Sequence, residues 1–208
     1  MFGGSSVDRA LAAFDQRQWK RARRLLEEAL MDEESALVRY RLGVLYWRGL
    51  GGEADKAAAV RNLSRAAESG YPPAQTAYGI ALRSGVGAAK DDDAARAQFR
   101  AAAGASDGEA MVQLATMSEP EDARRWLTRA AELGYAPAMP FLADLLMRKE
   151  PIEALAWLYA CVSLSGDHGA RDRAEALARE MSAREIEAAQ KAGRAYAKEI
   201  ERKARGKA

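Results

Sequence analysis

Apolar residues recur along most of the chain at spacings of three and four residues. This is the spacing of one face of an amphipathic α-helix, whereas a half-buried strand would alternate apolar and polar positions. Val38, Leu42 and Leu45 form one such stripe, and Ala59 and Leu63 belong to the next. The pattern therefore predicts an all-α chain of about twelve helices with no sheet.

Two sequence ladders indicate that the helices belong to an internal repeat. The segment AAESGYPPA at 66–74 returns as AAELGYAPA at 130–138, and a degenerate copy, AAGASDGEA, lies at 102–110, so the paired alanines step by 36 and then 28 residues. The second ladder steps by 36, 36 and 28 residues and consists of Leu42-Gly43, Tyr78-Gly79, Leu114-Ala115 and Leu142-Ala143. Because both ladders share the short step, they indicate a true repeat of four units, and with a capping hairpin at each end the chain is expected to stack about six helical hairpins.

Glycine and proline residues mark the ends of the predicted helices. Gly49-Leu50-Gly51-Gly52 and Gly85-Val86-Gly87 are expected to end one helix and reverse the chain. In mid-helix, glycine costs about 1 kcal/mol relative to alanine, so Gly43 and Gly79 predict close helix approach. The first turn of a helix tolerates a residue without an amide proton, so helices are expected to begin near Pro73, Pro120, Pro137 and Pro151, with Pro140 slightly deeper in its helix.

Taken together, the units follow the pattern A-x3-LG-x2-Y-x2-G-x-G, then D, then A-x6-AA-x2-G. This pattern resembles the Sel-one-like repeat, a relative of the tetratricopeptide repeat. The resemblance implies a right-handed α–α superhelix, that is, a solenoid that presents a concave surface to a partner protein. The second unit matches less completely, and the third and fourth are shortened. The first full unit matches at Leu42, Gly43, Tyr46, Gly49, Gly51, Asp55, Ala59, Ala66, Ala67 and Gly70.

The repeat register divides the chain into three parts. Residues 1–35 are expected to form a tetratricopeptide-like N-terminal capping hairpin, and residues 170–208 a C-terminal capping hairpin with a basic helical tail. Ser182 and Glu185 have the spacing of a capping box that opens the final helix. The four Sel-one-like repeats between the caps are expected at 36–73, 74–109, 110–137 and 138–169.

The composition argues against several kinds of chemistry. The chain has 32 basic and 30 acidic residues, a net charge of +2, which is too balanced for a nucleic-acid-binding protein. It has one cysteine, Cys161, and one histidine, His168, so a metal site or an acid–base catalyst would lack the usual side chains. We therefore expect no catalytic residues, no metal and no cofactor.

The two ends of the sequence bear on where the protein works. The first residues, MFGGSSVDRA, lack the basic and apolar regions of a signal peptide, and no apolar stretch reaches about 18 residues. These features favour a cytoplasmic protein and argue against a membrane partner, with a periplasmic or secreted protein as the alternative if a signal peptide was removed. Residues 191–208 carry seven basic and two acidic residues, which suit a helix C-terminus or, alternatively, contact with an acidic partner or membrane surface.

The sequence favours a non-catalytic scaffold or adaptor that docks a partner protein or peptide on the concave face of the repeat array. Two alternatives stay open: a structural homo-oligomer and a hydrolytic enzyme on a helical scaffold. The enzyme would need a cluster of titratable groups, whereas the sequence offers scattered carboxylates.

The concave face is predicted from the first helix of each hairpin, because steps of 100° per residue point a fixed set of positions away from the packed stripe. Tyrosine, tryptophan and arginine are frequent in binding hot spots, so Tyr40 and Trp47 are candidates unless they pack against the leading hairpin. The arginines would favour an acidic partner segment. The predicted face comprises Tyr40, Arg41, Val44, Trp47, Arg48, Thr76, Ile80, Arg83, Gln113, Thr116, Phe141, Asp144, Met147 and Arg148.

Overall fold

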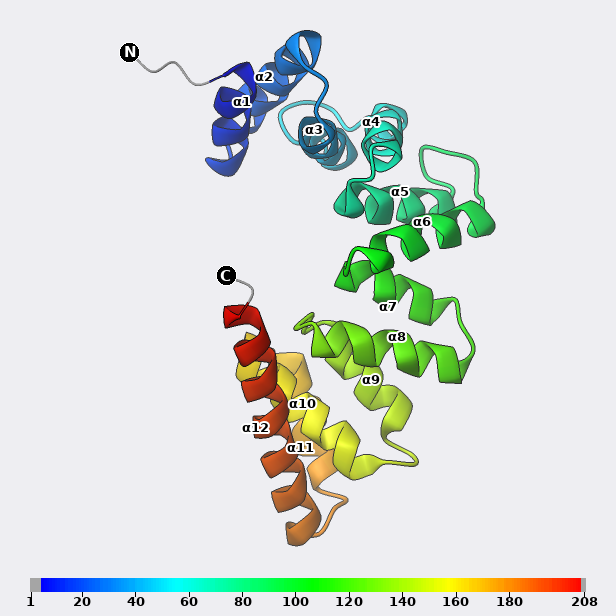
Figure 1. Ribbon diagram of the computed structural model, residues 1–208, viewed down its shortest axis with the longest axis vertical. Coiled ribbons are helices and arrows are strands. Elements are labelled where there is room, and N and C mark those ends of the chain that lie inside the picture. Colours follow the sequence, from blue (N-terminus) through cyan, green and yellow to red (C-terminus); the bar gives the residue numbers. More distant parts are fainter. Residues whose placement is uncertain (1–4, 207–208) are drawn as a thin grey trace. The chain divides into compact units, whose positions relative to one another are not determined.

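The computed structural model describes residues 5–206, and this range contains helices and no strand. The predicted all-α fold of helical hairpins is thereby confirmed (Figure 1). Its twelve helices are α1 Ser6–Asp15, α2 Trp19–Asp32, α3 Ala36–Arg48, α4 Lys56–Glu68, α5 Pro72–Ser84, α6 Asp92–Gly104, α7 Gly108–Thr116, α8 Pro120–Glu132, α9 Ala138–Leu146, α10 Pro151–Ser165, α11 His168–Ala178 and α12 Ala183–Arg205.

The chain forms two compact units that divide between Ala105 and Ser106. In the first unit α1 packs on α2, α3 on α4 and α5 on α6, and the contacts of α2 with α3 and of α4 with α5 join these hairpins. In the second unit α7 packs on α8 and α9 on α10, and α8 contacts α9. Within each unit, a hairpin is therefore stabilised by its neighbours in the sequence.

Short polar side chains and prolines begin most of the helices. A side-chain oxygen of the residue before the helix accepts a hydrogen bond from a first-turn backbone N–H, which satisfies a donor that the helix leaves unpaired. Pro120 and Pro151 open α8 and α10, and Pro140 is the third residue of α9, where its missing amide proton breaks no helical hydrogen bond. The capping residues of this type include Asp55, Asp91, Asp107, Asp167 and Ser182, the last in the predicted capping box with Glu185.

The small residues of the repeat lie where two helices of a hairpin meet. A Cβ atom added at Gly43 of α3 would lie 2.9 Å from the Leu63 side chain of α4. In the next hairpin, a Cβ atom at Gly79 of α5 would lie 2.6 Å from the ring of Phe99, which is fully buried in α6. Both distances are too short for a real contact, so glycine allows the close approach that the sequence predicts.

The glycine turns also join one hairpin to the previous one. Gly51 and Gly87 have φ angles of +80° and +77°, and a side chain at either would collide with a backbone carbonyl. The carbonyl belongs to Trp19, the first residue of α2, for Gly51, and to Lys56, the first residue of α4, for Gly87. Each turn therefore covers the start of the second helix of the preceding hairpin.

The hairpins of the second unit are shorter. α7 and α9 have 9 residues each, whereas α3 and α5 have 13. Their connections to the following helices, residues 117–119 and 147–150, contain no glycine. The start of α8 consequently has no glycine turn of the next hairpin to cover it.

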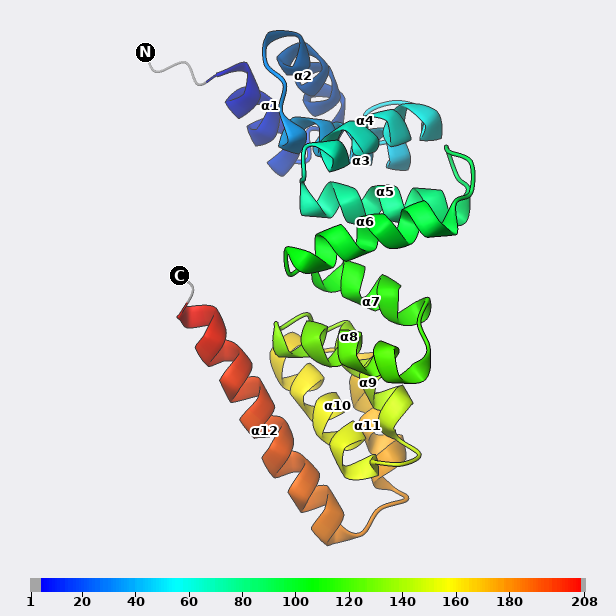
Figure 2. The same ribbon diagram turned by 45° about the vertical axis from the view of Figure 1, so that its right-hand side comes forward.

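The last two helices differ from the predicted hairpin at 170–208. Both α11 and α12 pack mainly on α10, and α12 runs alongside α10 in both views (Figure 2). The buried face of α12 includes Ala189, Gly193 and Ala197, which are small enough for close packing. The Tyr196 ring stacks on Trp157 of α10 with 4.4 Å between ring centroids. The segment predicted as a C-terminal capping hairpin therefore packs on α10 through both of its helices.

Candidate functional site

The predicted concave face falls on both compact units, so its two parts are described separately. In the first unit it comprises positions on α3 and α5, and in the second it comprises positions on α7, on α9 and directly after α9. All of these side chains reach the surface at least partly except Thr76. Thr76 is only 2% exposed, so its inclusion was wrong. A helical wheel places Thr76 away from the apolar stripe of α5, but packing within the repeat array buries its side chain.

The aromatic and basic side chains of α3 already contact other parts of the first unit. Arg41 forms an ion pair with Asp15 and lies over the ring of Phe14, with 4.6 Å to the ring centroid. Tyr40 and Trp47 have contacts outside the leading hairpin. Tyr40 packs against Tyr71 with 5.3 Å between ring centroids, and the Lys56 ammonium lies 4.4 Å from the Trp47 ring centroid. This part of the predicted face therefore consists largely of intramolecular packing.

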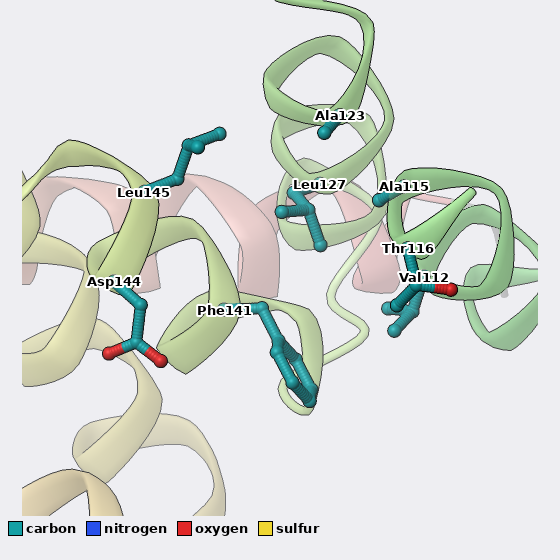
Figure 3. Close-up of a pocket in the computed structure, with 8 residues that line it drawn as sticks. All are labelled: Val112, Ala115, Thr116, Ala123, Leu127, Phe141, Asp144 and Leu145. Atoms are coloured by element: carbon teal, nitrogen blue, oxygen red, sulfur yellow. The ribbon is translucent and has the colours of Figure 1, made fainter. Parts of the chain in front are cut away.

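Three predicted residues of the second unit, Thr116, Phe141 and Asp144, come together around a groove of about 300 Å³. In Figure 3 the residues of α9 lie on one side of this groove and those of α7 on the other, with Ala123 and Leu127 of α8 between them. We call it the α7–α9 groove, and its lining comprises Val112, Ala115, Thr116, Ala123, Leu127, Phe141, Asp144 and Leu145.

The α7–α9 groove is apolar and accessible. Six of its eight lining side chains are apolar, and Phe141 and Leu145 are 49% and 37% exposed. By the repeat register, Leu145 occupies the position of Leu45 and Ala81, which are fully buried in the full-length hairpins. The shorter hairpin therefore exposes an apolar position that the longer hairpins bury, and sequence patterning alone did not identify Leu145.

The remaining predicted residues of the second unit do not line this groove. Gln113, Met147 and Arg148 are outside its lining, although Met147 is exposed directly after α9. Asp144, at the groove, forms an ion pair with Arg173 of α11 at 3.0 Å. The groove lining contains no basic side chain, so the predicted preference for an acidic partner segment has no support at this place.

Titratable groups with shifted pKa values lie outside the groove. The Arg124 guanidinium hydrogen-bonds to Glu150, with 2.7 Å between Nη2 and Oε2, and lowers the pKa of that carboxyl, whereas burial raises the pKa of Glu153. Both carboxyls share Arg124, which links α8 to α10. Burial also raises the pKa of Cys161, a side chain that is 1% exposed. None of these groups lines the groove.

No cluster of three or more His, Cys, Asp or Glu side chains within residues 5–206 is arranged to hold a metal ion. In the same range, no helix is both long and apolar enough to cross a membrane.

The chain resembles two solved structures. One is a Sel1 repeat protein from Oxalobacter formigenes, with a TM-score of 0.63 and 25% identity over 76% of this chain and 49% of that one. The other is a protective antigen of uropathogenic Escherichia coli strains that displays an SLR fold, with a TM-score of 0.51 and 16% identity over 87% of this chain and 49% of that one. The chain thus spans about half the length of each. No family model and no curated protein matches the sequence.

Helical hairpins that stack in sequence order and meet through small residues define the class of α-solenoid repeat proteins. The fold is that of the Sel1 (Sel-one-like) repeat proteins. The resemblance inferred from the sequence is thus confirmed for the fold.

Proposed function

We propose that the protein is a non-catalytic interaction scaffold that docks a partner protein or peptide through the α7–α9 groove. The observation that carries the proposal is the exposure of Phe141 and Leu145 beside a groove lined mostly by apolar side chains. Apolar surface of this kind is stabilised when a partner covers it, and aromatic anchors at such sites contribute much of the binding free energy.

The chemistry of the groove specifies the docking segment. Because the lining has apolar walls and one carboxylate, Asp144, it suits a segment that inserts apolar side chains and carries no negative charge at this edge. The partner is therefore better described as apolar than as acidic at the groove. A scaffold with this role needs no cofactor and no catalytic residue.

We expect Leu145→Asp to weaken binding of the partner by about thirtyfold or more, which is the size of a hot-spot loss. A charge at this position would be buried against Leu127 and Phe141 on docking. The partner is first identified by affinity capture with the wild-type chain, and its dissociation constant is then measured by calorimetry for each variant.

The matched control is Ile152→Asp. Ile152 is 37% exposed, as is Leu145, but it lies at the start of α10 and does not line the groove. This variant should keep the wild-type affinity. If both substitutions weaken partner binding equally, or if neither weakens it, then the groove is not the docking site.

The structural homo-oligomer is the second candidate function, and the same exposed residues allow a test of it. If a second copy covers the groove, light scattering will show a dimer or larger assembly for the wild-type chain and a monomer for Leu145→Asp. A monomeric wild-type chain at concentrations far above those in the binding assay excludes this candidate.

A further inference from the structure

The first unit contains a cavity of about 310 Å³ whose lining is rich in arginine. We call it the arginine pocket. It belongs to the α3–α4 hairpin and shares no lining residue with the α7–α9 groove. Its lining comprises Arg39 of α3 and Arg61, Asn62, Ser64, Arg65 and Glu68 of α4.

Arg39 is held firmly at one side of this pocket. Its guanidinium donates two hydrogen bonds to the carboxylate of Glu34, one of them 2.6 Å long, and a third to Oδ1 of Asn62 at 3.3 Å. Asn62 is itself oriented by a 2.9 Å hydrogen bond from Nδ2 to the carbonyl oxygen of Ala58. The Arg39 side chain is only 12% exposed, and Glu34 and Asn62 hold it in place.

Arg61 and Arg65 also line the pocket, and their charges are not balanced by ion pairs. They are four residues apart on α4, a spacing at which like charges repel each other. Both are exposed, and neither forms an ion pair with a carboxylate among residues 5–206. Arg65 acts on Glu34 only at longer range, where its charge adds to the hydrogen bond from Arg39 in lowering the pKa of that carboxyl. The three arginines thus face two carboxylates, those of Glu34 and Glu68.

The same surface recurs in the second unit, where one of its two equivalent arginines has an ion-pair partner. Arg125, Thr128, Arg129 and Glu132 of α8 occupy the repeat positions of Arg61, Ser64, Arg65 and Glu68, and they line a comparable cavity. There, Asp122 forms an ion pair with Arg125 at 3.0 Å. The α4 positions equivalent to Glu121 and Asp122 are alanines at 57 and 58. The arginine pair of α4 therefore lacks the acidic side chains that α8 supplies.

We propose that the arginine pocket binds a phosphate-type oxyanion, either as free phosphate or as a phosphoryl group on a larger molecule. Glu34 already occupies the fork of Arg39, whereas Arg61 and Arg65 have guanidinium donors available on one side of the same cavity. A tetrahedral oxyanion accepts hydrogen bonds from several directions, so both guanidinium groups can donate to it at once. This site does not depend on the docking groove.

Calorimetric titration of inorganic phosphate into the full chain, at constant ionic strength and in a buffer without other multivalent anions, tests the proposal. We expect saturable binding at millimolar phosphate that weakens as sodium chloride is added. The double variant Arg61→Gln/Arg65→Gln should bind at least about tenfold more weakly. Both positions are exposed and glutamine is a good helix former, so the variant should fold normally, as its thermal melt will show.

The equivalent variant of α8, Arg125→Gln/Arg129→Gln, is the matched control and should leave phosphate binding unchanged. A phosphoserine peptide and its unphosphorylated form distinguish the two sources of the oxyanion. Tighter binding of the phosphopeptide than of phosphate assigns the oxyanion to a partner, and equal binding assigns it to the free anion. The absence of saturable phosphate binding, or an equal loss in both double variants, overturns the proposal.

Discussion

The Leu42→Asp variant is expected to unfold with a free energy at least about 3 kcal/mol below that of the wild-type chain at pH 7. Leu42 of α3 is 3% exposed and belongs to an apolar cluster with Val38 and Leu45 that extends into α1 and α2. The substitution removes apolar packing and places a carboxylate among apolar side chains. Urea denaturation followed by circular dichroism measures the difference.

The pH dependence separates the buried charge from the lost packing. Burial raises the pKa of the new carboxyl in the folded state above its unfolded value of about 3.9. A carboxyl with a raised folded-state pKa contributes stability below its unfolded pKa, and this contribution is lost as the pH rises. The difference in the free energy of unfolding between the variant and the wild type should therefore grow from about pH 4 to pH 7. Leu42→Asn, which has a similar size and no titration, should show a deficit that does not vary with pH. Wild-type stability for Leu42→Asp at pH 7 would mean that the repeat register is wrong.

The repeat register could be predicted from sequence because it depends on a local regularity. Each hairpin must bury the same positions against its neighbours, so Leu42 and Tyr78 recur at equivalent places and Gly43 and Gly79 recur beside them. A single irregular step appeared in both ladders and marked the short hairpins. What this step does could not be read from the ladders. The structure shows that it uncovers the apolar position of Leu145.

The exposure of the predicted concave-face residues follows from the sequence less directly than the fold does. A helical wheel gives the direction of a side chain around its own helix axis, but burial also depends on where the neighbouring helices lie. Arg41 and Thr76 were assigned to the same open face, and the structure places Arg41 against α1 and buries Thr76. Phe141 and Asp144 were assigned by the same rule and do line the α7–α9 groove.

The arginine pocket left a signal in the sequence that repeat analysis can detect. Arg61 and Arg65 recur as Arg125 and Arg129 in the register that the paired alanines define. Comparison of equivalent positions shows alanine in α4 where α8 has Asp122, so the missing ion-pair partner of Arg61 is visible without coordinates. The orientation of the Arg39 side chain could not be predicted from the sequence, because it depends on hydrogen bonds to Glu34 before α3 and to Asn62 in α4.

The Gly43→Leu variant is expected to be destabilised by about 1–3 kcal/mol, the usual cost of overpacking a core. A Cβ atom at this position would lie 2.9 Å from the Leu63 side chain and 3.3 Å from the carbonyl oxygen of Ala59. The Leu63 side chain can move, but the Ala59 oxygen belongs to the α4 backbone, so α3 and α4 must separate. Because hairpins in the same unit rest on one another, thermal unfolding of residues 5–105 should shift as a whole.

Gly104→Leu is the control for the change of residue type. Gly104 is the last residue of α6, and a Cβ atom there would meet no other atom within 4 Å. Its substitution should change the free energy of unfolding by no more than about 0.5 kcal/mol, as is usual for exposed positions. If Gly43→Leu and Gly104→Leu melt alike, then α3 and α4 do not require glycine for their close approach. If Gly43→Leu alone lowers the free energy of unfolding strongly, then the stability of the first unit depends on the close spacing of α3 and α4. Glycine allows this spacing because it has no side chain.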